Sequence, residues 1–107
     1  MPKASIISSS QRIEEILQKG ERKEAKLLAL FQKKARGGKR PQFAFLTERE
    51  IKRAVDRNRL KRIARELARQ NQTGFKNLES IFYMKRKAIG QTFWQIKEDF
   101  DSLLPKG

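Results

Sequence analysis

The sequence contains no cysteine and no histidine among its 107 residues. Without cysteine, the chain forms no disulfide, carries no thiolate nucleophile and offers no thiolate ligand to zinc. Without histidine, it lacks the commonest general base and the commonest transition-metal ligand of proteins. These two absences exclude the most frequent side-chain routes to nucleophilic and metal-assisted catalysis.

Long apolar runs and clustered carboxylates are missing as well. No stretch reaches the roughly 20 apolar residues that a membrane-spanning helix needs, and the N-terminus does not read as a secretory signal. The acidic residues are scattered among basic neighbours, and the small groups are expected on solvent-facing helix surfaces: Glu14, Glu15, Glu98, Asp99 and Asp101. We therefore predict no catalytic residue, no protein metal site, no membrane partner and a cytoplasmic location.

What the chain has in excess is positive charge. Lysine and arginine total 26 against 12 acidic residues, which gives a net charge of +14. Such an excess favours polyanionic partners, namely nucleic acid or an anionic membrane surface. The length predicts a single domain with a modest core. We expect a flexible N-terminus over residues 1–9 and one domain over residues 10–107.

The clearest pattern lies in residues 53–70, which we interpret as a helix. At about 100° per residue, apolar side chains share one face: Leu60, Ile63, Ala64 and Leu67. A basic side chain also recurs at every fourth position: Arg53, Arg57, Lys61, Arg65 and Arg69. Like charges at this spacing cost roughly 0.2–0.5 kcal/mol per pair, and arginine forks match phosphate oxygens. The row indicates either a phosphate-binding face or a solvated charged face.

The other segments predict a mixture of helices and strands. Residues 10–19 suit a short helix ended by Gly20, and residues 42–47 and 80–84 suit strands. Thr92 and Gln95 form a potential capping box for a last helix. Residues 25–32 favour a helix by propensity, although the glycine-containing loop that follows them suggests a hairpin with residues 42–47.

A specific family resemblance starts from residues 54–66, which read Ala-Val-Asp-Arg-Asn-Arg-Leu-Lys-Arg-Ile-Ala-Arg-Glu. This segment resembles the signature helix of the protein component of bacterial ribonuclease P, with its Arg-Asn-Arg, its Lys-Arg and a further Arg. The likeness extends in order over residues 10–104. Residues 12–22 resemble the family's first helix and the end of that helix, 27–31 its first strand, 81–88 its last strand and basic exit, and 94–100 its closing helix.

The resemblance implies an α+β fold, a single-domain αβββαβα sandwich with a left-handed βαβ crossover, as in ribosomal-protein-like folds. It makes residues 27–31 a strand and so reverses the prediction from propensity. It also implies a role: the protein subunit binds the catalytic RNA and the 5′ leader of precursor tRNA. The RNA, with Mg²⁺ held mainly by RNA, would cleave the leader endonucleolytically and leave the mature tRNA 5′ end.

Two sets of binding residues follow from the resemblance. Those expected to bind the RNA subunit lie on the signature helix or next to it: Arg53, Arg57, Asn58, Arg59, Lys61, Arg62 and Arg65. Those expected to bind the leader come from the first helix, the strands and the basic exit: Ile13, Leu17, Phe31, Phe43, Lys85 and Arg86.

The chain departs from the family pattern just ahead of the signature helix. Residues 47–52 read Thr-Glu-Arg-Glu-Ile-Lys where the family usually has Ser-x-Lys-Lys-x-Gly.

Two other functions fit the composition: a structural RNA-binding protein, such as a ribosomal protein or an RNA chaperone, and a protein-only nuclease. The nuclease is disfavoured because the chain shows no catalytic constellation of side chains.

Overall fold

The structure, a computed structural model, describes residues 5–35 and 40–104. In chain order its elements are β1 (Ser5–Ile6), α1 (Ser10–Lys19), β2 (Glu21–Glu24), β3 (Leu28–Lys34), β4 (Gln42–Thr47), α2 (Ala54–Gln70), η1 (Gln72–Phe75), β5 (Leu78–Met84), η2 (Arg86–Ala88) and α3 (Phe93–Asp101). Apart from the two-residue β1 and the short 3₁₀ turns η1 and η2, this order confirms the predicted αβββαβα arrangement.

The strands form one sheet in the order β1-β4-β5-β3-β2. β5 runs parallel to β4 and antiparallel to β3, and therefore separates them. The predicted hairpin between residues 25–32 and 42–47 is wrong for this reason, and most of its expected glycine-containing loop lies outside the described residues. The central place of β5 gives its backbone hydrogen-bond partners on both sides, which a β3–β4 hairpin could not provide.

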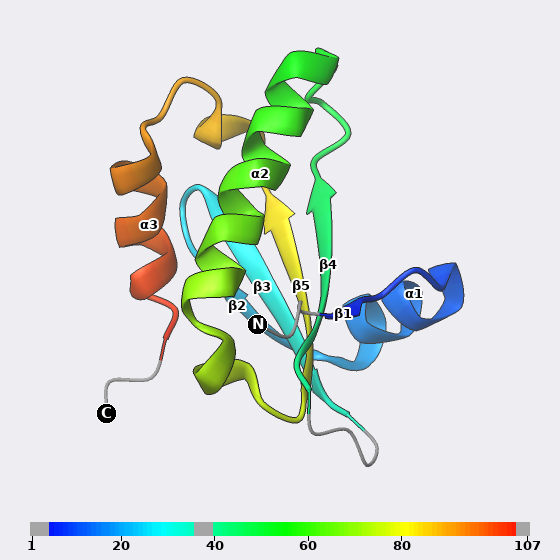
Figure 1. Ribbon diagram of the computed structural model, residues 1–107. Helices are drawn as coiled ribbons and strands as arrows, with labels where there is room; N and C mark the ends of the chain where they lie inside the picture. The colour runs from blue at the N-terminus through cyan, green and yellow to red at the C-terminus, as the bar shows by residue number, and fades with distance from the viewer. Residues whose placement is uncertain (1–4, 36–39, 105–107) are drawn as a thin grey trace.

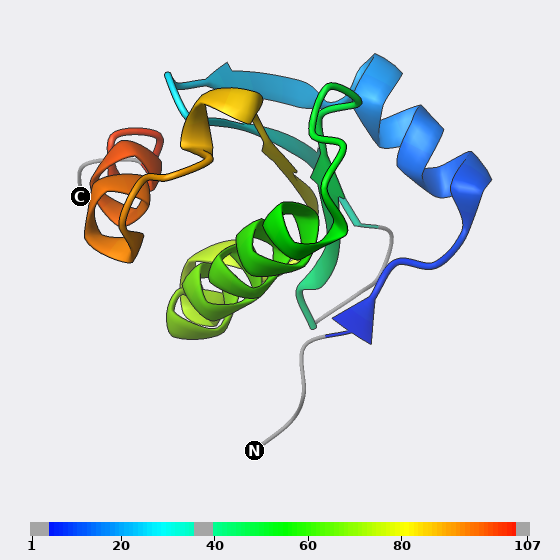
Figure 2. The same ribbon diagram turned by 90° about the horizontal axis from the view of Figure 1, so that it is seen from above.

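The sheet is the middle layer of a sandwich. Figure 2 shows α1 on one side of the sheet, with α2 and α3 together on the other. In Figure 1, β4 and β5 both point upwards, α2 runs in front of them, and β5 lies to the left of β4. The β4–α2–β5 crossover is therefore left-handed, as expected, although nearly all such connections are right-handed.

The larger core lies between the sheet and the pair α2 and α3. It contains the predicted apolar stripe of α2 together with strand residues such as Leu30 and Met84. A set of phenylalanine rings forms its centre, with centroids 5.4–6.2 Å apart: Phe43, Phe45, Phe75, Phe82 and Phe100. Each fully buried ring stabilises the fold by roughly 1.5–3 kcal/mol, so this cluster fixes η1 and α3 against β4 and β5.

A smaller apolar cluster lies on the α1 side of the sheet. Along β3, Leu28 and Leu30 belong to the larger core, whereas Ala29 and Phe31 belong to this second cluster. This period of two is the signature of a strand. Burial on both faces overrides the helix propensity of residues 25–32, and the strand that the resemblance implied is confirmed as Leu28–Lys34.

The first described residues are attached to the sheet. Ser5 and Ile6 pair with β4, the Ile7 backbone N–H donates to the Phe43 carbonyl at 2.7 Å, and Ile7 is buried. Ser9 then caps α1 by accepting a hydrogen bond from the Arg12 backbone N–H. The prediction of a flexible N-terminus over residues 1–9 is therefore wrong for residues 5–9, while residues 1–4 lie outside the described residues.

The last helix begins and packs as its sequence indicates, with one exception. Thr92 and Gln95 form the predicted capping box at the start of α3. Asp99, expected to face solvent, instead accepts a hydrogen bond at 2.7 Å from the Leu27 backbone N–H, just ahead of β3. That contact satisfies a partly buried backbone donor and joins the end of α3 to the sheet.

Candidate nucleic-acid interface

The first candidate surface is the side of α2 that faces away from the sheet. Because four residues span slightly more than one helical turn, the basic row advances by about 40° at each step. Arg57, near the start, is therefore half-buried beside the loop before the helix, whereas Arg65 and Arg69 are exposed. Asn58 and Arg62 are exposed as well. The basic residues spiral around α2 instead of forming one straight row.

Two arginines of the Arg-Asn-Arg segment bind the protein's own backbone. Arg57 donates to the carbonyls of Ile51 and Lys52 at 3.1 and 2.7 Å, which ties the preceding loop to the helix. Arg59 donates to the Gln91 carbonyl at 2.5 Å, in the segment before α3. Part of the donor capacity of these two residues thus holds neighbouring segments in place.

Few protein carboxylates neutralise this face. Glu66 pairs with Arg69, whose Nε lies 2.9 Å from Oε2, and this hydrogen bond lowers the pKa of Glu66 below its ordinary value. The Arg65 guanidinium carbon lies 6.0 Å from the centre of the Phe45 ring. Within the described part of the chain, Arg53, Lys61 and Arg62 form no ion pair. Their charge remains available to an external anion.

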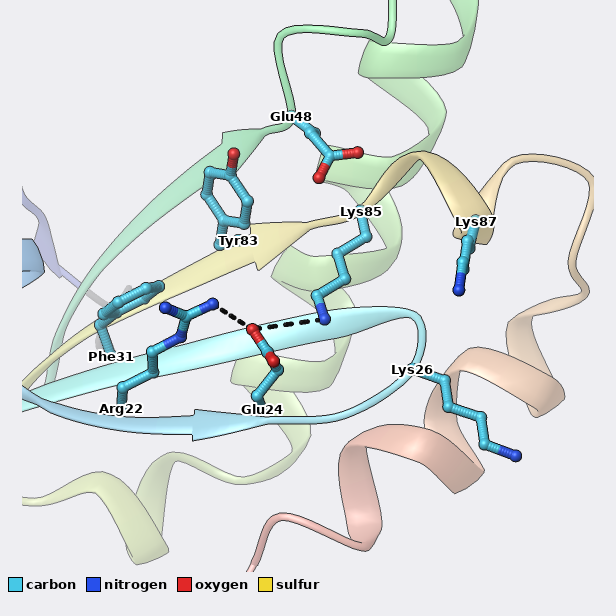
Figure 3. Close-up of a pocket in the computed structure, with 8 residues that line it drawn as sticks. All are labelled: Arg22, Glu24, Lys26, Phe31, Glu48, Tyr83, Lys85 and Lys87. Carbon is cyan, nitrogen blue, oxygen red and sulfur yellow. Dashed lines mark hydrogen bonds and ion pairs between the residues drawn. The ribbon is translucent and has the colours of Figure 1, made fainter.

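The second candidate surface is a hollow on the α1 side of the sheet, which we call the cationic hollow. Its lining combines four cations, two carboxylates and two aromatic rings: Arg22, Lys26, Lys85, Lys87, Glu24, Glu48, Phe31 and Tyr83 (Figure 3). They come from β2, the turn after it, β3, the loop after β4, β5 and the segment that follows β5. The lining of the hollow therefore carries a net positive charge and includes two aromatic rings.

An ion-pair network occupies one side of the hollow. Glu24 lies between Arg22 and Lys85 in Figure 3 and pairs with both, with Lys85 Nζ at 3.5 Å. The hydrogen bond from Arg22, followed by the charges of Arg22 and Lys85, lowers the pKa of Glu24. Lys85 also donates to the Ala25 carbonyl at 2.8 Å. Lys26 and Lys87 lie farther from Glu24 on the right of the same view.

The two rings of the hollow differ in accessibility. Phe31 is only 9% exposed, and the Arg22 guanidinium carbon lies 5.5 Å from its ring centre. Tyr83 is half-buried and meets Phe31 edge-on, with the centroids 6.3 Å apart. Burial, followed by the charges of Glu48 and Glu50, raises the pKa of Tyr83. The phenol is thus a neutral hydrogen-bond donor at neutral pH.

The structure separates the residues expected to bind the leader. Ile13, Leu17 and Phe31 share the α1-side cluster, and Lys85 lines the cationic hollow. Phe43, by contrast, is fully buried in the larger core on the opposite face of the sheet, so its assignment to the leader is wrong. In β4 it is Ala44 that points towards α1.

Other residues of the hollow were not anticipated. The side chain of Arg86 is exposed but does not line the hollow, whereas Arg22, Glu24 and Tyr83 do. Strand pairing could have indicated Arg22, because it lies directly opposite Phe31. The same alternation places Tyr83, two residues after Ile81, on the Phe31 face of the sheet.

The atypical segment before α2 has an ordered structure. The Glu48 backbone N–H donates to the Met84 carbonyl at 2.9 Å, and the Glu48 carboxylate accepts from the Arg86 backbone N–H at 3.1 Å. The Ile51 N–H closes a turn onto the Glu48 carbonyl. Glu48 therefore joins the ends of β4 and β5 while its carboxylate borders the cationic hollow.

In residues 5–35 and 40–104, no three His, Cys, Asp or Glu side chains gather as a metal-binding group. None of the helices in these ranges combines the length and the apolar character that a membrane crossing requires.

The fold and the two surfaces define a class: a basic α+β sandwich with a left-handed crossover, a cationic helix that is only partly neutralised by carboxylates, and a cationic hollow. A model of the Ribonuclease P family matches residues 1–106. The ribonuclease P protein component of Syntrophomonas wolfei is 29% identical over 108 residues, covering 99% of this chain and 89% of that protein. The chain therefore belongs to the ribonuclease P protein family.

Solved structures support the fold. The RNase P protein of Staphylococcus aureus superposes with a TM-score of 0.85 at 19% identity, covering 94% of this chain and 93% of that chain. The RNase P protein of Thermotoga maritima superposes with a TM-score of 0.81 at 21% identity, covering 96% and 99%. The α+β fold inferred from the resemblance is thereby confirmed.

Proposed function

We propose that this chain is the protein subunit of ribonuclease P, which binds the catalytic RNA and the 5′ leader of precursor tRNA. In this proposal the RNA subunit, with Mg²⁺ held mainly by RNA, performs the endonucleolytic cleavage that produces the mature tRNA 5′ end. The protein acts in the cytoplasm by reducing the repulsion between the two RNAs and by positioning the leader. Its membership of the family and its uncompensated positive charge support this role.

The exposed face of α2 is the single observation that carries the proposal. Lys61 and Arg62 have no carboxylate partner among the described residues, and Asn58 lies beside Arg62 on the exposed face. Fixed cations on a rigid helix attract a phosphate backbone and release its counterions when they bind. We assign this face to the catalytic RNA, with Arg57 and Arg59 both positioning the helix and offering their remaining donors.

The cationic hollow is assigned to the single-stranded leader. Single-stranded nucleic acid is bound by aromatic rings that stack on bases next to cations that contact phosphates. Tyr83 supplies the accessible ring, while Lys26 and Lys87 supply cations that make no ion pair among the described residues. Ile13 and Leu17, from α1, form the apolar wall beside Phe31.

Reconstituted cleavage tests the proposal. The purified chain is added to a bacterial ribonuclease P RNA and a precursor tRNA, at Mg²⁺ concentrations too low for the RNA alone to be efficient. We expect faster removal of the 5′ leader when the protein is present, and no cleavage by the protein alone. A chain that binds RNA without accelerating cleavage would indicate a structural RNA-binding protein, and cleavage without the RNA subunit would indicate a protein-only nuclease.

A further inference from the structure

The side chain of Trp94 has no evident role in the folded chain. It is the single tryptophan of the sequence and is 72% exposed, in the first turn of α3. Large aromatic side chains normally bury most of their surface, and tryptophan is enriched at the energetic centres of interfaces. Its exposure therefore points to a partner.

Trp94 lies beside a groove between α2 and α3, the α2–α3 groove, lined by Arg62, Ile63, Arg65, Glu66, Arg69 and Phe93. Phe93 connects the two features, because its ring lines the groove and meets the Trp94 ring edge-on at 5.3 Å. The Arg59–Gln91 hydrogen bond holds the segment before α3 against α2. The indole is thus displayed next to the cationic face of α2.

The charge of the groove identifies the class of partner. Three arginines line it against one carboxylate, Glu66, and that carboxylate is already paired with Arg69. A second copy of this chain would bring another net charge of +14 to the same place, which disfavours self-association. A polyanion that also carries flat aromatic groups satisfies both the arginines and the indole.

We propose that Trp94 is a stacking platform for an unpaired base of the catalytic RNA, whose phosphates contact Arg62 and Arg65 across the α2–α3 groove. This inference rests on the proposed function and extends the RNA-binding surface from α2 onto α3. A base on an exposed aromatic ring contributes roughly 1–3 kcal/mol. Bases paired within a duplex are not free to stack in this way.

The fluorescence of Trp94 provides a direct test, because no other tryptophan contributes. A bacterial ribonuclease P RNA should quench the emission as it binds, whereas a fully paired RNA duplex of similar length should bind without quenching. Trp94→Leu should weaken binding of the ribonuclease P RNA roughly 5- to 150-fold. It should leave the salt dependence of binding unchanged, because stacking releases no counterions. Trp94→Tyr should restore much of the affinity.

The control is Gln18→Ala, which removes an exposed uncharged side chain from α1, on the opposite side of the sheet from α2 and α3. It should bind the RNA like the unmodified chain, and thermal melts should show all variants folded.

Unchanged emission on binding, or an unchanged affinity of Trp94→Leu, would overturn the inference while leaving the proposed function intact. Quenching that depends on protein concentration without RNA would assign the surface to self-association and also overturn it. Failure of the unmodified chain to bind the RNA at all would count against the proposed function itself.

Discussion

Tyr83 shows how single side chains set the chemistry of the cationic hollow. Burial and the charges of Glu48 and Glu50 raise its pKa above the ordinary 10.0. A neutral phenol therefore contributes stability that is fully present below the unfolded pKa and is lost as the pH rises through the folded pKa. Because the chain has one tyrosine, the ultraviolet absorbance of its phenolate reports this titration alone.

Glu48→Gln should lower the pKa of Tyr83 towards its ordinary value, since the amide oxygen can still accept from the Arg86 N–H while the charge is removed. An alkaline absorbance titration of the two proteins measures the difference. Glu98→Gln, an exposed substitution on α3, is the matched control and should leave the titration unchanged. A phenol that titrates at or below its ordinary value in the unmodified chain would contradict the described surroundings of Tyr83.

The two rings of the hollow should contribute unequally to leader binding. Tyr83→Leu, assayed in the reconstituted complex, should weaken the binding of precursor tRNA by about 1–3 kcal/mol, as expected for a lost base stack. Phe31→Leu should cost less, because Arg22 already covers the Phe31 ring. Binding of mature tRNA, which has no leader, should not change for either variant. Equal losses for precursor and mature tRNA would exclude a role of these rings in leader binding.

For single residues, reasoning from the sequence correctly predicted which side chains of α2 are buried, but it placed one residue of a strand on the wrong face of the sheet. The spacing of Leu60, Ile63 and Leu67 determines their burial without further information. Phe43 could be placed only by knowing which face of β4 meets α1, and that depends on packing between distant elements. The signal was nevertheless present, because Phe43 and Phe45 share one face of β4 and two large rings favour the larger core.

Among the elements, the joint between α1 and β2 depends on Gly20. Its backbone φ is −73°, so no left-handed conformation requires glycine there. A Cβ would instead lie 2.5 Å from the Ile16 carbonyl oxygen and 2.9 Å from that of Gln32. The sequence correctly indicated that the helix stops at Gly20, but glycine is needed there because the backbone lies close to the carbonyls of Ile16 in α1 and Gln32 in β3, and the second contact is visible only in the tertiary structure.

Gly20→Ala should therefore reduce the free energy of unfolding by about 1–3 kcal/mol, the usual cost of overpacking. Urea-induced unfolding measures this change. Gly74→Ala is the control, because its Cβ would meet no atom within 4 Å, and it should change stability by less than about 1 kcal/mol. If both substitutions had the same small effect on the free energy of unfolding, the result would contradict the close approach of α1 and β3 at Gly20.

The segment around β3 shows the limit of local reasoning about elements. Its leucine and alanine residues favour a helix in isolation, yet Leu30 and Phe31 are buried on opposite faces of the sheet. The family resemblance gave the correct strand because it carries information about the whole fold. The insertion of β5 between β3 and β4 is likewise a non-local choice, which the apparent hairpin pattern could not indicate.

For the whole molecule, the dominant property is a net charge of +14, part of which is gathered on α2 and in the cationic hollow. The apolar faces of the sheet and of α2 are satisfied internally, whereas most of the positive charge on the outside of α2 is not. The fold thus supports a cationic helix on a rigid sandwich. An unpaired cation and a cation already held by a carboxylate should then contribute differently to RNA binding.

The salt dependence of binding to a bacterial ribonuclease P RNA tests this central claim most directly. Arg62→Ala should reduce the slope of log affinity against log salt by about one, as expected for one lost phosphate contact. Arg69→Ala should reduce it less, because Glu66 already pairs with Arg69, and Glu66→Gln should increase it by releasing that arginine. Identical slopes for the unmodified chain and Arg62→Ala would contradict the assignment of α2 to the RNA.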